Sequence, residues 1–310
     1  MNAPTTLARA GRALREVGRR RSLEVLLLQA SPLLGAAFGG GFGAIDLGRW
    51  TILLAGSVLL TGHVFVFNDW AGHRGDLNDP RRAPHVFGGE GVGRGAVAAL
   101  ALGLLAAAMA ALGALGFHAV VIGLAIACLG FLYSDSHAAG KGTPVFASLI
   151  HLLGGTLHFL LGYGVTGPID ARGLAIGLFF GLVFAAGHLN QEVRDHDADA
   201  RNGIRTTAVV FGPRCASLAS LVLFSAAYAE LALLACLEVV PRQLLWATLL
   251  WPLQVAWSLP ALRGEPGFEQ ARRLQRRYRF LFAILGLAMV LALVASGAAR
   301  HPASGTFALR

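Results

Sequence analysis

A polar stretch between two apolar runs carries the residue types best suited to chemistry. Residues 188–207 read HLNQEVRDHDADARNGIRTT. Within them, Glu192, Asp195 and Asp199 fall at positions i, i+3 and i+7, which places the three carboxylates on one face of a helix. Like charges so close together are destabilising unless a cation offsets them, and Mg²⁺ prefers oxygen ligands. The stretch therefore indicates a magnesium site, with a solvated acidic loop as the alternative.

A second acidic element strengthens the magnesium interpretation. Another apolar run ends at Asn68 and Asp69, and Asp76 follows on the same helical face as Asp69. Two carboxylate-bearing helix ends indicate an internal duplication. Such ends can face each other across a cavity and hold Mg²⁺ against a diphosphate. The magnesium site is therefore inferred from the pair of motifs and not from either motif alone.

The composition is that of a helical protein with many membrane spans. Of the 310 residues, 55% are hydrophobic and 14% are charged, and the mean hydropathy is +0.61. Soluble domains carry about 25% charged residues, so we expect a membrane bundle with no second, soluble domain. The three cysteines lie within or at the start of apolar runs, which argues against a disulfide framework or a zinc site. The arginine-rich N-terminus lacks a cleavage-site pattern, so we predict no signal peptide.

Nine apolar runs are long enough to span a membrane, and the two carboxylate motifs follow the second and the sixth. With the N-terminus inside, 21 of the 26 Lys and Arg residues fall on the cytoplasmic side and 5 fall outside. This distribution agrees with the positive-inside rule and puts both motifs on the cytoplasmic side. The predicted spans are residues 25–45, 50–67, 93–114, 116–133, 144–163, 173–190, 214–236, 243–262 and 278–297.

This topology divides the chain into three parts. Residues 1–22 hold six arginines, and we expect this basic segment to lie on the anionic headgroups of the cytoplasmic leaflet. Residues 23–298 form the nine-helix transmembrane domain, and residues 299–310 form a short external tail. A net charge of +9 can also suggest nucleic acid, but the charge follows the membrane topology. We therefore expect membrane lipids as partners and no nucleic acid.

The paired motifs resemble those of the UbiA superfamily of intramembrane prenyltransferases. Members of that family carry N-D-x-x-D-x-x-x-D after the second helix and D-x-x-D-x-x-x-D after the sixth. The resemblance extends over essentially all nine predicted spans. The corresponding residues here are Asn68, Asp69, Gly72 and Asp76 in the first motif and Glu192, Asp195 and Asp199 in the second.

Two further stretches are similar to the family, and two positions depart from it. Residues 203–207 look like its G-x-R-T stretch, and the loop from Tyr133 to Lys141 is similar to the Y-S-x-P-P-x-x-x-K loop of quinone- and chlorophyll-type members, without the paired prolines. Gly72 stands where the family has an aspartate that helps to hold a metal. Glu192 replaces another aspartate conservatively. Gly72 leaves open the number of metal ions, a changed reaction or a non-catalytic member.

The resemblance implies a reaction and a role for each residue. In the family, an allylic diphosphate ionises and a nucleophile captures the carbocation, while Mg²⁺ and basic side chains neutralise the leaving diphosphate. For the arginines, positive-inside topology alone is the alternative. The implied catalytic metal ligands are Asp69, Asp76, Asp195 and Asp199, with Glu192 as a supporting metal ligand. The implied substrate-binding residues are Asn68, Arg81, Arg82, Tyr133, Lys141 and Arg205.

Two histidines of the fifth predicted span add to this set. His151 and His158 lie seven residues apart and therefore share a helical face. Ionisable residues within a membrane usually face the bundle interior, so we expect both to line the cavity beside the acceptor. Interhelical hydrogen bonding is the alternative.

The sequence thus predicts an all-α bundle of UbiA type with nine transmembrane helices. The expected function is Mg²⁺-dependent transfer of a prenyl group from a prenyl diphosphate to a lipophilic or aromatic acceptor, in quinone or lipid biosynthesis. One alternative is a terpene cyclase, in which the substrate's own double bond is the nucleophile. The other is a non-catalytic membrane protein or a transporter. We expect an integral protein of the bacterial inner membrane, with its active site facing the cytoplasm.

Overall fold

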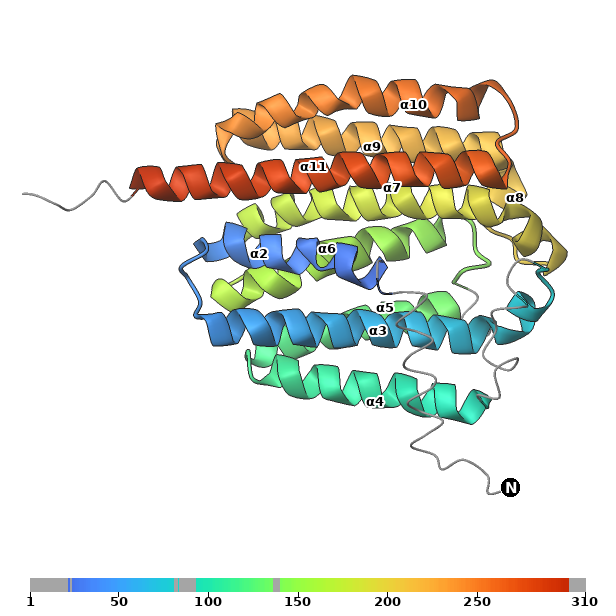
Figure 1. The fold of residues 1–310 in the computed structure, drawn as a ribbon, viewed down its shortest axis with the longest axis horizontal. Coiled ribbons are helices and arrows are strands. Elements are labelled where there is room, and N and C mark those ends of the chain that lie inside the picture. The colour runs from blue at the N-terminus through green and yellow to red at the C-terminus, as the bar shows by residue number, and fades with distance from the viewer. Residues whose placement is uncertain (1–21, 23, 81–82, 84–92, 136–139, 301–310) are drawn as a thin grey trace, which may run out of the picture.

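The structure is a computed structural model that describes residues 22, 24–80, 83, 93–135 and 140–300. Within these residues the chain is helical and contains no strand. The long helices run side by side along the long axis of the molecule (Figure 1). They are α2 (Ala30–Gly40), α3 (Leu47–Leu77), α4 (Arg94–Gly113), α5 (Phe117–Ser134), α6 (Phe146–Thr166), α7 (Ala171–Arg201), α9 (Pro213–Cys236), α10 (Trp251–Arg263) and α11 (Phe268–Arg300), with the short α8 (Thr207–Phe211) and the 3₁₀ helix η3 (Arg242–Leu250).

Seven of the described helices are long and apolar enough to cross a membrane, namely α3, α4, α5, α6, α7, α9 and α11. The expected first span is shorter, because its apolar helix covers only Glu24–Gly40. The expected eighth span is divided into η3 and the 13-residue α10, with a proline in the first turn of α10. Proline lacks a backbone N–H and is tolerated only at a helix start or a kink. The count of nine spans therefore remains a prediction.

The two motif-bearing helices are longer than their apolar runs. The predicted second and sixth spans end at residues 67 and 190, whereas α3 continues to Leu77 and α7 to Arg201. Both acidic motifs are therefore helical, and the spacing of their carboxylates is real helical geometry. Each motif extends from the apolar part of its helix as a rigid polar end.

Glycines bring α2 and α6 into close contact at the centre of the bundle. A Cβ added at Gly162 would meet the backbone carbonyl of Pro32, and one added at Gly35 would meet that of Phe159. Small residues allow such close approach of membrane helices. Phe159 itself is fully buried and stacks on Phe180 of α7 with 4.7 Å between ring centroids. The main cluster of buried side chains includes this contact region and extends into α3, α4, α5, α9 and α11.

The end of the bundle away from the motifs is held by hydrogen bonds from α7. Arg172 donates to the backbone carbonyls of Phe38 at 2.8 Å and of Val239 at 3.1 Å, near the ends of α2 and α9. Asp170 precedes α7 and accepts a hydrogen bond from the Gly173 N–H at 2.8 Å. This bond and one from the Tyr163 hydroxyl hold the pKa of Asp170 below its usual value. These contacts fix the first turn of the helix that carries the second motif.

Candidate active site

The C-terminal ends of α3 and α7 are in direct contact. The Asn202 side chain donates to the Gly75 carbonyl at 3.0 Å and accepts from Asn78 at 3.1 Å. Arg201 lies 3.5 Å from Asp79, which is buried. The two acidic motifs therefore lie at the same end of the bundle, although 116 residues of chain separate Asp76 from Glu192.

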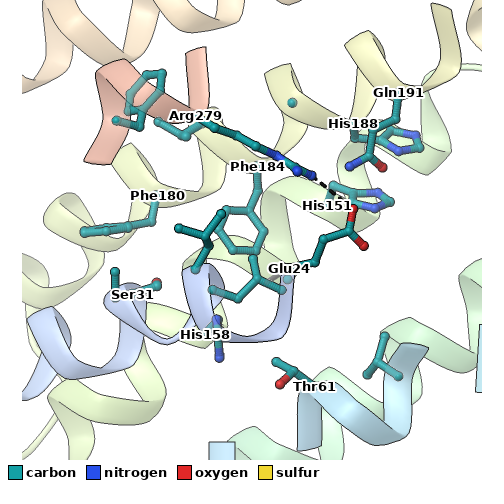
Figure 2. Close-up of a pocket in the computed structure, with 18 of the residues that line it drawn as sticks. Glu24, Ser31, Thr61, His151, His158, Phe180, Phe184, His188, Gln191 and Arg279 are labelled. Carbon is teal, nitrogen blue, oxygen red and sulfur yellow. Dashed lines mark hydrogen bonds and ion pairs between the residues drawn. The ribbon is translucent and has the colours of Figure 1, made fainter. Parts of the chain in front are cut away.

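A cavity of about 960 Å³ opens beside these helix ends and runs into the bundle. Side chains from α2, α3, α5, α6, α7 and α11 line it, and Figure 2 shows a part of this lining. Eight of the predicted site residues belong to the lining, which brings parts of four helices and one loop together. They are Asn68, Tyr133, Lys141, His151, His158, Glu192, Asp195 and Asp199.

The other predicted site residues lie elsewhere. Asp69 and Asp76 are half-buried on α3 at the same end of the bundle but are not part of the cavity lining. Arg205 is exposed in the connection between α7 and α8 and also lies outside the lining. Arg81 and Arg82 fall outside the described residues. The cavity therefore unites the second motif with Asn68, Tyr133, Lys141 and the two histidines of α6.

The two aspartates of the second motif each have a basic partner. The Lys141 ammonium lies 2.8 Å from Oδ1 of Asp199, whose side chain is almost fully buried. The backbone N–H of Lys141 also donates to the Tyr133 carbonyl at 3.0 Å, so this part of the α5–α6 loop is held against the end of α5. Arg194 holds both oxygens of Asp195 at 2.9 Å, a bidentate geometry that planar guanidinium groups favour.

Glu192 is buried and makes its contacts within the protein. Its Oε1 lies 2.9 Å from His188 Nε2, and its Oε2 accepts from the Ala208 N–H at 3.1 Å. Ala208 belongs to the first turn of α8, where backbone N–H groups have no partner in the helix. The glutamate thus binds the start of α8 to α7 and orients the His188 ring.

Three rings form a cluster on the cavity wall. The imidazoles of His151 and His188 stack with centroids 3.7 Å apart and an interplanar angle of 8°. The Tyr133 ring meets both edge-on, at 4.9 Å from His151 and 5.6 Å from His188. Figure 2 shows His151 and His188 on neighbouring helices beside the cavity. The sequence places His188 on the motif face, but only the fold reveals that it stacks on His151.

His158 combines both roles that its sequence position suggests. It lines the cavity, and its Nε2 lies 2.9 Å from the Ser57 hydroxyl of α3. The side chain is buried, with 3% exposed. His158 therefore bonds α6 to α3 while it forms part of the cavity wall.

Four charged or amide residues of the lining were missed by sequence reasoning. Glu24 and Arg279 form an ion pair at 3.2 Å between the start of the α2 segment and α11, marked by a dashed line in Figure 2. Gln191 and Arg194 follow His188 on α7. Arg279 shares a helical face with Phe282 and Gly286, at i+3 and i+7, and all three residues line the cavity.

The rest of the lining is mainly apolar and reaches the opposite end of the bundle. Trp50 and Asn68, at the two ends of the lining on α3, are five helical turns apart, roughly 27 Å. Aromatic side chains from α3, α7 and α11 form much of the wall. They include Phe65, Phe179, Phe180, Phe184 and Phe282. The cavity thus has a charged mouth and a deep hydrophobic interior.

The oxygen donors at the mouth suit a hard divalent cation that arrives with phosphate. Among the described residues, no three His, Cys, Asp or Glu side chains lie close enough together to form a metal site by themselves. Mg²⁺ commonly binds through one or two carboxylates, with substrate phosphates and water as the remaining ligands. Asp195 and Asp199, at the mouth of the cavity, supply such a pair.

The fold and the cavity define an all-helical integral membrane protein with a deep, polar-mouthed internal site. The UbiA prenyltransferase family matches residues 30–285, and the chain belongs to this family. The resemblance that the paired motifs indicate is thereby confirmed. A search of the curated proteins finds no match.

Solved structures show the same fold at low sequence identity. A UbiA homolog from Archaeoglobus fulgidus bound to GPP and Mg²⁺ is 16% identical, with a TM-score of 0.66 over 90% of this chain and 99% of that one. A digeranylgeranylglyceryl phosphate synthase is 17% identical, with a TM-score of 0.68 over 91% of this chain and 99% of that one. A UbiA homolog from Aeropyrum pernix K1 is 18% identical, with a TM-score of 0.69 over 86% and 97%.

Proposed function

We propose that this protein is an intramembrane prenyltransferase that moves a prenyl group from a prenyl diphosphate to a lipophilic or aromatic acceptor, with Mg²⁺ as cofactor. The observation that carries the proposal is the cavity itself. Its mouth holds Asp195, Asp199 and Lys141, and its interior is apolar. This polarity matches a substrate with a diphosphate head and a hydrocarbon tail. Structures of UbiA homologs bound to GPP or DMAPP with Mg²⁺ support the same assignment.

We assign Mg²⁺ binding to Asp195 and Asp199 of α7, joined by Asp69 and Asp76 of α3. Bound there, Mg²⁺ would neutralise the diphosphate as it leaves. Glu192 is better suited to positioning than to metal binding, because each of its oxygens already has a partner within the protein. It holds the start of α8 against α7 and fixes the His188 ring in the cavity wall.

Basic and amide side chains at the mouth would bind the diphosphate oxygens. Lys141 and Arg194 already contact the aspartates, so both stand within reach of a ligand bound between them. Asn68 lies on the facing helix, held by a hydrogen bond from its amide to the Ser134 hydroxyl at 3.0 Å. Tyr133 borders the same mouth. Arg81, Arg82 and Arg205 remain candidate diphosphate ligands by resemblance.

The reaction breaks the bond between C1 of the prenyl group and the diphosphate oxygen, and the electron pair leaves with the diphosphate. Positive charges at the mouth lower the energy of this step, because they stabilise the charge that develops on the leaving group. The apolar interior excludes water from the allylic cation. Aromatic faces such as those of Phe180 and Phe184 attract that cation. The acceptor nucleophile then forms the new bond to C1.

We place the mouth on the cytoplasmic side of a bacterial inner membrane. The basic loops of the nine-span topology lie on the side of the two motifs, as the positive-inside rule requires. The prenyl tail would then extend across the membrane interior within the bundle. Such an enzyme would act in quinone or lipid biosynthesis.

Product analysis tests the proposal directly. Purified protein in lipid vesicles would receive Mg²⁺, prenyl diphosphates of increasing length and a panel of lipophilic and aromatic acceptors, and mass spectrometry would identify the products. A prenylated acceptor together with released diphosphate is the expected result. A cyclised hydrocarbon formed without acceptor would instead identify a terpene cyclase. Absence of diphosphate release with every substrate would identify a non-catalytic protein.

A further inference from the structure

The first turns of α11 carry arginines on their outer face. Four positions in residues 272–277 are exposed arginines, whereas the positions between and beside them are buried. The arginines are Arg272, Arg273, Arg276 and Arg277, and the buried residues are Ala271, Leu274, Gln275 and Tyr278. None of the four arginines belongs to the cavity lining. These turns therefore have one side packed in the bundle and one strongly basic side at the surface.

The basic side of α11 continues along the helix as a stripe of exposed apolar side chains. Phe280 follows Arg276 by four residues, and its side chain is 60% exposed. Ile284, Leu287 and Leu291 follow Phe280 at i+4, i+7 and i+11 and are exposed as well. Because α11 is long and apolar enough to cross a membrane, this stripe faces lipid tails. The arginines begin one turn before the stripe and therefore lie at the level of the lipid headgroups.

A tryptophan of α10 indicates the same level. Arg277 lies over the ring of Trp257, 5.4 Å from its centroid, and the tryptophan is half-buried. Tryptophan is enriched where the hydrocarbon region meets the headgroups, because one end of its ring system is apolar and the other is a hydrogen-bond donor. Two neighbouring helices thus place the edge of the hydrocarbon region near the same turn.

Nearby carboxylates do not neutralise this basic face. Arg272 and Arg276 are i, i+4 neighbours, as are Arg273 and Arg277, and like charges at that spacing repel each other. Within the described part of the chain, Glu269 alone forms an ion pair with the face. It lies 3.9 Å from Arg272, and both side chains are more than half exposed, so the pair contributes little. An anion held along these two turns would therefore stabilise the helix.

We propose that this arginine face binds the phosphate groups of anionic phospholipids in the leaflet at the mouth of the cavity. The acyl chains of the same lipids lie along the apolar stripe that begins at Phe280. A phospholipid meets both halves of this surface, whereas a soluble anion meets only the arginines. Guanidinium groups one turn apart can share a phosphate, and each can bind two of its oxygens.

The inner side of the same turns holds the second motif. Gln275 is buried, and its Oε1 accepts a hydrogen bond at 2.9 Å from Arg194, the arginine that holds Asp195. One turn earlier, the Ala271 carbonyl accepts from Asn190 at 3.2 Å. Lipid bound on the outer side therefore stabilises the turns that support a carboxylate of the mouth. The inference goes beyond the proposed transfer reaction, because the surface lies outside the cavity.

The Trp257 ring beside Arg277 gives a local readout of lipid binding. In purified protein labelled with 5-fluorotryptophan and held in neutral detergent micelles, the ¹⁹F resonance of Trp257 is identified among five by its loss in Trp257→Phe. Titration with phosphatidylglycerol should shift this resonance until it saturates. Two probes separate the parts of the lipid: phosphatidylcholine with the same acyl chains has no net charge, and inorganic phosphate has no acyl chain. Both should need much higher concentrations for the same shift.

A double variant tests the arginines against a matched control. Arg273→Gln/Arg276→Gln removes two charges from the face but leaves Arg277 on the reporter ring. An arginine near an anionic lipid contributes roughly five-fold in affinity, so the apparent Kd for phosphatidylglycerol should rise roughly 25-fold. Arg94→Gln/Arg214→Gln removes two exposed arginines at the starts of α4 and α9, and its Kd should stay near the wild-type value.

Three results would overturn the proposal. The first is an equal Kd in wild type and Arg273→Gln/Arg276→Gln. The second is an equal shift with phosphatidylcholine, because the apolar stripe alone would then bind lipid. The third is an equal shift with inorganic phosphate, which would identify a site for free anions.

Thermal unfolding in the same micelles checks that the variants fold and adds a second test. Without anionic lipid, Arg273→Gln/Arg276→Gln should be at least as stable as wild type, because like-charge repulsion is removed. Phosphatidylglycerol should raise the unfolding temperature of the wild type more than that of this variant. An equal rise in both would contradict binding at the arginine face. None of these measurements needs turnover, so a wild type that releases no diphosphate would refute the proposed function while the lipid affinities still decide this inference.

Discussion

The ammonium of Lys141 lies 2.8 Å from the carboxylate of Asp199, and this ion pair joins the α5–α6 loop to the end of α7. The lysine side chain is 29% exposed and the aspartate side chain 5%, so the ammonium is the member of the pair that can move toward a ligand. We infer that Lys141 transfers from Asp199 to the diphosphate when substrate binds.

The first prediction concerns this lysine. Lys141→Gln keeps a hydrogen-bonding side chain but removes the charge, and it should lower kcat/KM for the prenyl diphosphate by roughly 10²–10³-fold, as for the loss of other charge-stabilising groups. Lys141→Arg should retain a substantial part of the activity. Steady-state kinetics of diphosphate release would measure both. Equal activity of Lys141→Gln and wild type would exclude Lys141 from diphosphate binding.

The second prediction tests the aspartates of the second motif. Asp195→Asn and Asp199→Asn preserve side-chain shape but remove a charge, and each should reduce turnover by roughly 10²–10³-fold or more. Asp197→Asn is the matched control, because Asp197 lies between them on the same helix but is exposed and outside the cavity lining. Turnover of purified variants with intact thermal unfolding would be compared. Wild-type turnover in either cavity variant would refute the site.

The third prediction concerns Gly72 in the first motif. A Cβ at this position would lie 3.7 Å from Oδ2 of Asp76, an ordinary contact, so an aspartate fits there. Gly72→Asp should preserve activity or lower the Mg²⁺ concentration needed, because it adds an oxygen ligand beside Asp69 and Asp76. Asp76→Ala should abolish activity. Diphosphate release measured against Mg²⁺ concentration decides both, and a fully active Asp76→Ala would mean that the first motif binds no catalytic metal.

The fourth prediction uses the depth of the cavity. Gly286 lines the cavity on α11, and no atom lies within 4 Å of a Cβ added there. Gly286→Phe should fill part of the apolar interior and shift the preference toward shorter prenyl diphosphates. Gly103→Phe is the control, because Gly103 is an exposed glycine of α4 with equally open surroundings outside the cavity lining. Competition between geranyl and geranylgeranyl diphosphate would report the change, and equal ratios in both variants would contradict it.

The fifth prediction is the topology. Charge distribution places the N-terminus in the cytoplasm and, with nine spans, the C-terminus outside. A reporter fused to each end and tested for accessibility in intact cells should find them on opposite sides. Finding both ends on one side would contradict the nine-span topology. It would show that either η3 and α10 together, or the short helix Glu24–Gly40, do not form a membrane span.

Helix type and the placement of the motifs could be predicted from the sequence, because both depend on local patterns. Long apolar runs predict helices in a membrane, and the carboxylate spacing is correct since α3 and α7 stay helical through both motifs. The positions of the helix ends were harder to predict from the sequence. Hydropathy reports where the apolar run stops, whereas the hydrogen-bonded helix continues into the polar region for as long as its backbone partners remain.

The composition of the cavity was only partly predictable. Lys141 and Asp199 were identified by their motifs, but their contact depends on how α5, α6 and α7 pack. The pairing of His151 with His188 is likewise a product of packing between two helices. Arg194 and Arg279 were counted as topology signals, because a count of charges on each side of the membrane does not separate an arginine that faces headgroups from one that faces an internal cavity.

The basic partners of Asp195 and Asp199 make substrate binding an exchange of ions. The ion pairs Lys141–Asp199 and Arg194–Asp195 each carry no net charge, so these two aspartates are already compensated before a ligand binds. In the proposed reaction, Lys141 and Arg194 would exchange carboxylate oxygens for phosphate oxygens, and the aspartates would exchange basic side chains for metal. Little net charge moves into the membrane interior, so capture of the substrate should depend only weakly on ionic strength.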